Sequence, residues 1–169
     1  VIPVLRTSAV TKEGYDVLDE MFERLPPQKR SGDDFKMYID KKYNIEGVGP
    51  VVSGTISSGS VEVDDELLIG PFKNGEFKET TARSIQIHYY DVDEAKAGQI
   101  ASIAVGNVDY DELDRGMVLL PKSKNPKPTR KFEVEMMVLN HPTSITEGYE
   151  PVIHLETLSE TVIIHPNQD

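Results

Sequence analysis

The sequence predicts a mainly β protein: a small closed antiparallel β-barrel, preceded by a strand and a helix and followed by part of a second β unit. Between residues 35 and 121 the chain consists of short β-branched or alternating segments separated by glycine-containing turns, which is typical of a closed barrel. Two polar or proline-rich stretches, 28–34 and 122–130, separate this part from its neighbours. Residues 1–27 have the pattern of a strand followed by an amphipathic helix.

Residues 1–27 are expected to form one strand, a loop and one helix. The apolar residues 1–6 indicate a short strand, and Thr7, Ser8 and Ala9 follow as a loop. The next segment is expected to be helical up to Pro26 and Pro27, because the residue before a proline is disfavoured in the helical region. One strand and one helix have nothing to pack on, so we expect this unit to be the end of a larger domain. The helical stripe repeats with a 3.6-residue period: Tyr15, Val17, Leu18, Met21, Phe22 and Leu25.

The barrel is expected to span residues 35–121. Asn74 and Gly75 form a strong hairpin signal. Gly47, Gly49 and Gly54 are expected to allow a tight bend or a β-bulge where a small barrel turns a corner. The pattern predicts strands over residues 35–40, 51–56, 66–69, 80–90, 100–105 and 117–120.

A further β unit is expected over residues 131–169. Its predicted strands cover residues 131–139, 149–156 and 161–164. Three strands rarely bury a core by themselves, so this unit is expected to be an incomplete second barrel. We therefore expect both ends of the chain to be places where a longer protein was cut.

The composition restricts the classes of partner. The formal net charge is -11, and such an acidic chain is a poor non-specific ligand for nucleic acid, so no DNA partner is expected. One basic stretch, residues 122–131, is either a solvated linker or a local RNA contact. The chain has no cysteine, no secretory signal and no apolar run near the roughly 18 residues of a membrane span. A cytoplasmic protein without a membrane partner is expected.

The sequence motifs argue against an enzyme in this chain. The phosphate loop G-x-x-x-x-G-K-[ST], the magnesium motif D-x-x-G and the guanine motif N-K-x-D do not occur. Gly47 and Gly49 form only a G-x-G that leads into a strand. The four histidines show no metal-ligand spacing, and the acids between Asp109 and Asp114 have the pattern of a solvated turn. No catalytic residue, metal ligand or cofactor is therefore expected in this chain.

Several segments resemble a known family. Residues 47–55, followed by Gly59, resemble the opening of the second domain of elongation factor Tu, a translation-factor GTPase. Residues 97–99 and 115–119 match later landmarks of the same barrel. The start of its third domain is similar to residues 132–135 and 148–151.

Two further likenesses extend this resemblance. The loop Thr7, Ser8 and Ala9 looks like the last guanine-recognition loop of a GTPase domain. Within the superfamily, the chain resembles the GTP-binding-protein-1-like branch of archaea and eukaryotes. The residues that carry this likeness are 67–71, 84–86 and 139–145.

The resemblance implies a fragment of a larger GTPase that acts on translation or RNA surveillance. The parent is expected to bind GTP and magnesium and to hydrolyse GTP, whereas this chain is expected to be inactive. Its barrels would contact the parent's GTPase domain and tRNA, the ribosome or an RNA-processing partner. In the alternative, the barrels dock on the GTPase domain and relay its nucleotide state without contacting RNA.

The resemblance also implies a set of partner-binding residues. In elongation factor Tu the second domain holds the aminoacylated end of tRNA, and the matching positions are Val51, Gln86, His88 and Tyr89. Gln86 stands where that factor has glutamate, and Tyr89 where it has arginine. A tyrosine could stack on a terminal adenine. In the alternative interpretation Tyr89 faces the barrel core with Ile85 and Ile87, and Gln86 and His88 are solvated.

Overall fold

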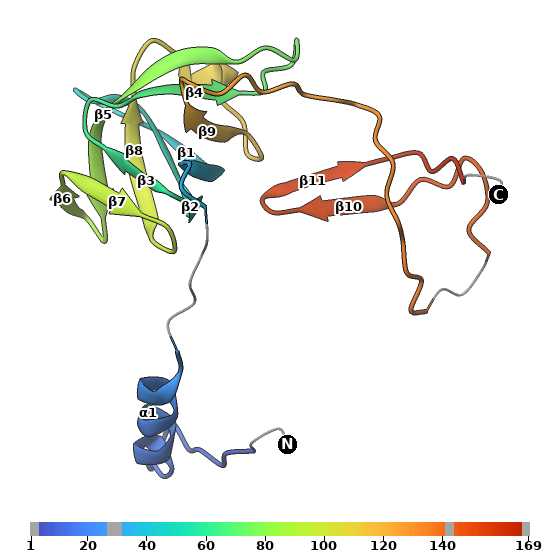
Figure 1. The fold of residues 1–169 in the computed structure, drawn as a ribbon. Coiled ribbons are helices and arrows are strands. Elements are labelled where there is room, and N and C mark those ends of the chain that lie inside the picture. Colours follow the sequence, from blue (N-terminus) through green and yellow to red (C-terminus); the bar gives the residue numbers. More distant parts are fainter. Residues whose placement is uncertain (1–3, 27–31, 141–143, 167–169) are drawn as a thin grey trace.

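The structure, a computed structural model, describes residues 4–26, 32–140 and 144–166. Six antiparallel strands form a closed barrel in the order β4-β9-β1-β2-β8-β5, and pairing of β4 with β5 closes the ring (Figure 1). The predicted mainly β, closed-barrel fold is confirmed. The barrel strands are β1 (Lys36–Ile45), β2 (Gly49–Ser58), β4 (Glu66–Gly70), β5 (Lys78–Ile87), β8 (Ile100–Val105) and β9 (Val118–Pro121).

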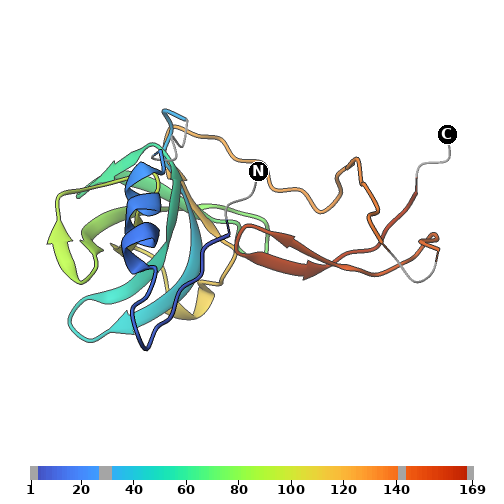
Figure 2. The same cartoon turned by 90° about the horizontal axis from the view of Figure 1, so that it is seen from below.

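Shorter elements decorate the barrel and flank it. β6 (Tyr90–Val92) forms a hairpin with β5, and β3 (Ser60–Glu62) pairs with β7 (Glu94–Lys96). A 3-10 turn, η1 (Tyr110–Glu112), lies between β8 and β9. Outside the barrel are α1 (Tyr15–Arg24) and the hairpin of β10 (Val152–Leu155) and β11 (Leu158–Thr161) (Figures 1 and 2).

The alternation of apolar and polar residues along the strands decides which side chains enter the core. Every second residue of a strand points to the same face, so the apolar positions converge inside the ring. The core is made mainly of aliphatic side chains, which suit the pleated inner surface. Its most deeply buried large side chains are Met37, Ile39, Val52, Ile56, Val61, Ile69, Ile85, Ile103, Val105, Leu113 and Leu119.

A bulge in β1 explains why a glycine is needed in β2. The pairing register of β1 shifts between Ile39 and Lys41, where Ile39 pairs with Gly54. A Cβ atom at Gly54 would lie 1.9 Å from the carbonyl oxygen of Tyr38, which is backbone and cannot move aside cheaply. The expected link between Gly54 and a bulge is therefore confirmed, and the cause is close backbone approach.

The predicted strand over residues 80–90 does not run through to its end. β5 stops at Ile87, which pairs with Tyr90, and His88 and Tyr89 form the two-residue turn between β5 and β6. Both have positive φ, 51° and 70°, as in the type I′ turns of tight hairpins. Tyr89 is 96% exposed, so the interpretation of Tyr89 as a core residue is wrong. The sequence did not predict this turn, because residues 88 and 89 are His-Tyr and not the usual Asn-Gly.

The regions outside the barrel differ more from expectation. Residues 4–6 and 131–139 form no strand, and the predicted strand over 161–164 is replaced by β11. A β-strand needs a hydrogen-bonding neighbour, and none of the described segments pairs with these two stretches. The ladder of the last hairpin does continue beyond its strands, because Ile164 N–H donates to the Tyr149 carbonyl at 2.9 Å.

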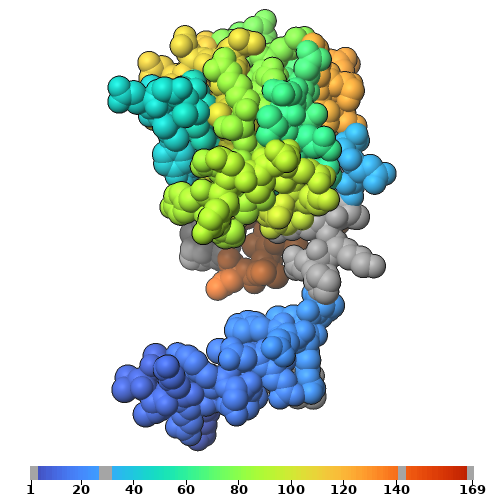
Figure 3. All heavy atoms as spheres, turned by 90° about the vertical axis from the view of Figure 1, so that its left-hand side faces the viewer, coloured from blue at the N-terminus to red at the C-terminus, as the bar shows by residue number. Residues whose placement is uncertain are grey.

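The helix forms where its 3.6-residue period predicted it. Gly14, with φ 76°, precedes its first turn, and the Leu25 N–H donates to the Phe22 carbonyl at its end. None of its residues is buried, and Figures 1 and 3 show α1 standing apart from the barrel. Its apolar stripe, including Val17 and Phe22, is thus exposed.

Candidate partner-binding surface on the barrel

The outer face of four neighbouring strands, β1, β2, β8 and β5, carries two of the four residues expected to bind a partner, Val51 and Gln86. Inward-pointing Val52, Ile103 and Ile85 are cross-strand neighbours and are almost fully buried. Because side chains alternate along a strand, the residues next to them point outward. The register therefore places Val51, and the residues aligned with it, on the outside of the barrel.

Two cross-strand rows make up this outer face. The first row runs through Tyr43, Val51, Ala104 and Ser84, and the second through Lys41, Ser53, Ser102 and Gln86. The middle of each row holds only small or short side chains, whereas the long side chains Tyr43, Lys41 and Gln86 stand at the margins. Val51 and Ala104 are almost fully buried, so of these central residues only Ser53 and Ser102 are partly exposed.

Of the four predicted positions, the structure brings three together. Gln86 ends the outer row on β5, and its Nε2 donates to Asp91 Oδ1 of β6 at 2.8 Å. His88 and Tyr89 follow as the turn of the same hairpin. Val51 is separate: it lies two strands away on β2 and is only 5% exposed. The candidate site is thus centred on the β5–β6 hairpin.

The tip of this hairpin displays two aromatic rings. Tyr89 is 96% exposed and its neighbour Tyr90 is 76% exposed. Residues with a Cβ atom avoid the left-handed region, at a cost of about 1–2 kcal/mol per residue, so a turn made of His88 and Tyr89 is strained. Strain of this kind persists mainly at functional sites. A ring that is held in water at such a cost is a candidate for recognition.

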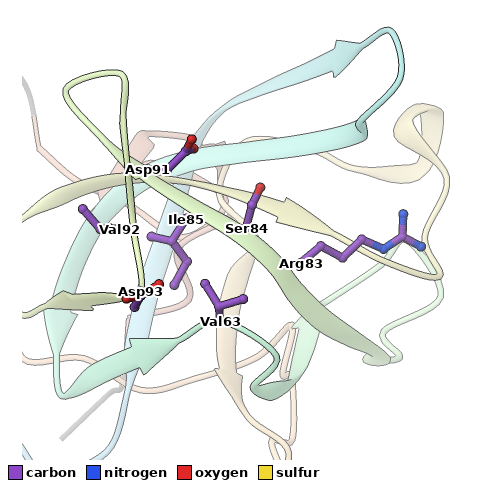
Figure 4. Close-up of a pocket in the computed structure, with 7 residues that line it drawn as sticks. All are labelled: Val63, Arg83, Ser84, Ile85, Asp91, Val92 and Asp93. Atoms are coloured by element: carbon purple, nitrogen blue, oxygen red, sulfur yellow. The ribbon is translucent and has the colours of Figure 1, made fainter.

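A shallow hollow of about 210 Å³ lies beside the hairpin, and Asp91, Val92 and Asp93 form one side of it (Figure 4). Ile85 and Val63 contribute its apolar part. Arg83 and Ser84 line its other end, so only the part beside the two aspartates is unsuitable for a phosphate group.

Ion pairs engage two of the five cations in the basic stretch after the barrel, residues 122–131. Lys122 Nζ lies 3.1 Å from carboxylate oxygens of both Glu66 and Glu79, and Lys124 Nζ lies 2.5 Å from Asp34. The hydrogen bonds that Lys122 donates to the carboxylates of Glu79 and Glu66 raise the pKa of Lys122 above its ordinary value. These contacts tie the stretch to the barrel and favour its interpretation as a linker.

The loop that resembles a guanine-recognition loop is closed on itself. Ser8 N–H donates to the Glu13 carbonyl at 3.1 Å, the Ser8 carbonyl accepts from Lys12 N–H at 2.8 Å, and Ser8 Oγ accepts from Thr11 N–H. Thr7 and Ala9 are exposed beside it. These bonds order the entry to α1, and nothing among them forms a phosphate cradle.

Two classes of feature are not found in the part of the chain that the structure describes. Residues 4–26, 32–140 and 144–166 contain no group of three or more histidines and acids that could hold a metal ion. Within the same ranges, no helix is long and apolar enough to span a membrane.

Three residues of these outer rows were not predicted from the sequence: Tyr43 and Lys41 on β1, and Ser84 on β5. The strand predicted over 35–40 is too short to include Tyr43, and β1 in fact continues to Ile45. The alternation of residues 36–45 could have extended it. The strands that pair with β1 could not be predicted from the sequence, because closure of the barrel brings together strands that are distant in the chain, such as β1 and β9.

Comparisons with known proteins agree with this geometry. Residues 49–120 match the family model for elongation factor Tu domain 2. The chain is 34% identical to GTP-binding protein 1 of Xenopus laevis over 96% of its length, and 32% identical to GTP-binding protein 2 of Homo sapiens over 97%. It is 34% identical to elongation factor 1-alpha of Archaeoglobus fulgidus over 82%. The chain spans 25%, 28% and 32% of these three relatives, respectively.

Two solved structures share the fold. Translation elongation factor SelB from Methanococcus maripaludis, in its apo form, superimposes with a TM-score of 0.60 and 35% identity, over 70% of this chain and 26% of that one. A bacterial selenocysteine-specific elongation factor, EF-Sec, gives a TM-score of 0.64 at 23% identity, over 72% of this chain and 21% of that one. The second likeness shows the fold alone.

Proposed function

We propose that this chain, whose residues 49–120 belong to the elongation factor Tu domain 2 family, is the partner-binding part of a translation-factor-like GTP-binding protein. Residues 1–27 would be the end of a GTPase domain, 35–121 its second domain and 131–169 the beginning of a third. GTP and magnesium would bind outside this chain, with Thr7, Ser8 and Ala9 completing the guanine loop. We also propose a cytoplasmic location.

The partner we propose is the 3′ end of a tRNA, bound at the β5–β6 hairpin. The observation that carries this proposal is the strained turn that displays Tyr89 and Tyr90 in water, next to the polar edge of Gln86. An exposed ring can stack on a base, worth about 1–3 kcal/mol per base. Gln86 is engaged with Asp91 and could present its amide oxygen to a base edge.

A second candidate function is a relay that contacts only protein. The exposed stripe of α1, with Val17 and Phe22 in water, would then be covered by a GTPase domain. The net charge of -11 and the paired lysines Lys122 and Lys124 favour this alternative, because they leave little attraction for phosphate.

A filter-binding titration of the chain with aminoacylated and with bare tRNA, at low and at moderate salt, distinguishes these functions. The proposed function predicts saturable binding that persists at moderate salt, because stacking is less sensitive to salt than phosphate contacts. Binding of neither tRNA at low salt would refute RNA recognition by this chain and favour the relay.

A further inference from the structure

We infer that Arg83, in the middle of β5, is a phosphate-binding position for the backbone of a bound RNA strand. This inference rests on the proposed function and adds a second contact to it. Arg83 was not among the predicted partner-binding residues, and it lies outside the hydrogen bonds and ion pairs given above.

The backbone around Arg83 is irregular in a way that turns its side chain outward. The register between β5 and β8 shifts between Ala82, which pairs with Val105, and Ser84, which pairs with Ala104. Arg83 is the extra residue of this bulge, and it is exposed while Ala82 is fully buried. A bulge re-aims a side chain that regular pairing would place elsewhere.

Gly106, the residue after β8, makes room for the guanidinium. A Cβ atom at Gly106 would lie 2.9 Å from Nε and 3.2 Å from Nη2 of Arg83. Gly106 does not have the positive φ that requires glycine at many turns of this barrel. The guanidinium thus lies against the backbone of Gly106, and a side chain at this position would have to displace it.

Among the described residues, Arg83 has no ion pair and no hydrogen bond, unlike most cations that surround the barrel. The paired cations of the barrel and its linker are Lys78, Lys96, Arg115, Lys122 and Lys124. Among the described residues Lys41 and Lys73 likewise have no ion pair, so Arg83 is distinguished by its bulge position and not by the missing acid alone. Its planar fork suits a phosphate, which it can bind through two parallel N–H groups.

The positions of Tyr89 and Arg83 suggest that a bound RNA strand would run along β5, from the hairpin turn towards the middle of the strand. Arg83 lies four residues before the end of β5 at Ile87, which corresponds to about 13 Å at 3.3 Å per residue, and the turn that contains Tyr89 follows. Figure 4 shows the Arg83 side chain extending away from Asp91 and Asp93, so these carboxylates do not occupy it. A base at Tyr89 and a backbone phosphate at Arg83 could therefore belong to one strand that follows β5.

The test measures binding of bare tRNA to the 169-residue chain over a series of salt concentrations. Arg83→Gln should weaken binding roughly tenfold, the loss of one charge-assisted hydrogen bond. It should also make the slope of log K against log salt less steep by about 0.7–0.9, the value for one phosphate contact. Gly106→Ala should weaken binding as well, because the new methyl group displaces the guanidinium while the charge remains.

Lys127→Gln is the matched control, because it removes the same charge from an exposed position of the linker. It should change neither affinity nor slope. Equal effects of Arg83→Gln and Lys127→Gln, or an unchanged slope in a folded Arg83→Gln chain that still binds, would overturn this inference and leave the proposed function standing. Absence of tRNA binding by the unmodified chain would overturn both.

Discussion

Replacement of Tyr89 by glycine should make the barrel more stable and a poorer ligand for RNA. Tyr89 is 96% exposed, so removal of its ring loses almost no burial. Its φ of 70° costs a residue with a Cβ atom about 1–2 kcal/mol, and glycine is free of this cost. Glycine also makes the unfolded chain more flexible, and this lowers the unfolding free energy by roughly 0.5–1 kcal/mol. The net gain in unfolding free energy should be about 0.5–1 kcal/mol.

Two further variants separate the ring from the backbone. Tyr89→Ala keeps the strain and loses the ring, so its stability should match that of the unmodified chain while its affinity for the tRNA 3′ end falls. Tyr89→Phe keeps both ring and strain and should change little. Loss of one stacked base predicts a decrease of about 1–3 kcal/mol in binding free energy for the glycine and alanine variants. The salt slope should stay constant in all three, since no phosphate contact is removed.

Thermal unfolding, followed together with filter binding, checks both halves of this reasoning. For a barrel of this size a gain of 1 kcal/mol raises Tm by about 4–8 °C, so the glycine variant should melt a few degrees higher. A sharp loss of stability in Tyr89→Ala would show that the ring packs on the barrel. Unchanged affinity in a well-folded Tyr89→Ala chain would refute stacking, and a glycine variant that melts lower would refute the argument from strain.

Three other outcomes are expected. Gly54→Ala should destabilise the barrel by about 1–3 kcal/mol in a denaturant titration, because its Cβ meets the Tyr38 carbonyl; Gly47→Ala meets nothing within 4 Å and should cost only its backbone strain, so an equal loss in both would contradict the close approach. The pKa of Lys122 should lie above its ordinary value, and Glu79→Gln should lower it in an NMR titration. Because this pKa is raised on folding, the stabilisation that it reports is complete below the ordinary lysine pKa and is lost as pH rises through the folded value; a Lys122 pKa that Glu79→Gln leaves unchanged would refute the pairing. The chain should not hydrolyse GTP, and phosphate release above background from a pure sample would disprove this.

The barrel could be predicted from sequence because its signals are local. The alternation over residues 35–40, the β-branched residues over 51–56 and the Asn74-Gly75 turn each indicate a strand or a hairpin without reference to the rest of the chain. The helix was predictable for the same reason, since its stripe repeats within ten residues. The failures lie where a strand depends on a neighbour: residues 131–139 have a strand-like pattern but no described partner, and no strand forms.

The candidate site was only partly predictable. Gln86, His88 and Tyr89 are close in sequence, and the structure keeps them together. Because these residues resemble strand positions of the family, the sequence did not predict the turn at residues 88 and 89. The two left-handed residues that create this turn carry none of the usual glycine or asparagine. For that reason the sequence placed Tyr89 in a groove or in the core, whereas the structure places it in water.

The sequence by itself determined the fold class and the absence of GTPase motifs, because these follow from local periodicity, from turn residues and from short motifs. The tertiary structure alone decided which side chains share a surface. Tyr43 meets Val51, and Arg83 rests on Gly106, through pairings of β1 with β2 and of β5 with β8 that join distant parts of the chain. The physical reason is barrel closure: hydrogen bonding around the ring sets the register, and a shift of one residue would turn each side chain to the opposite face.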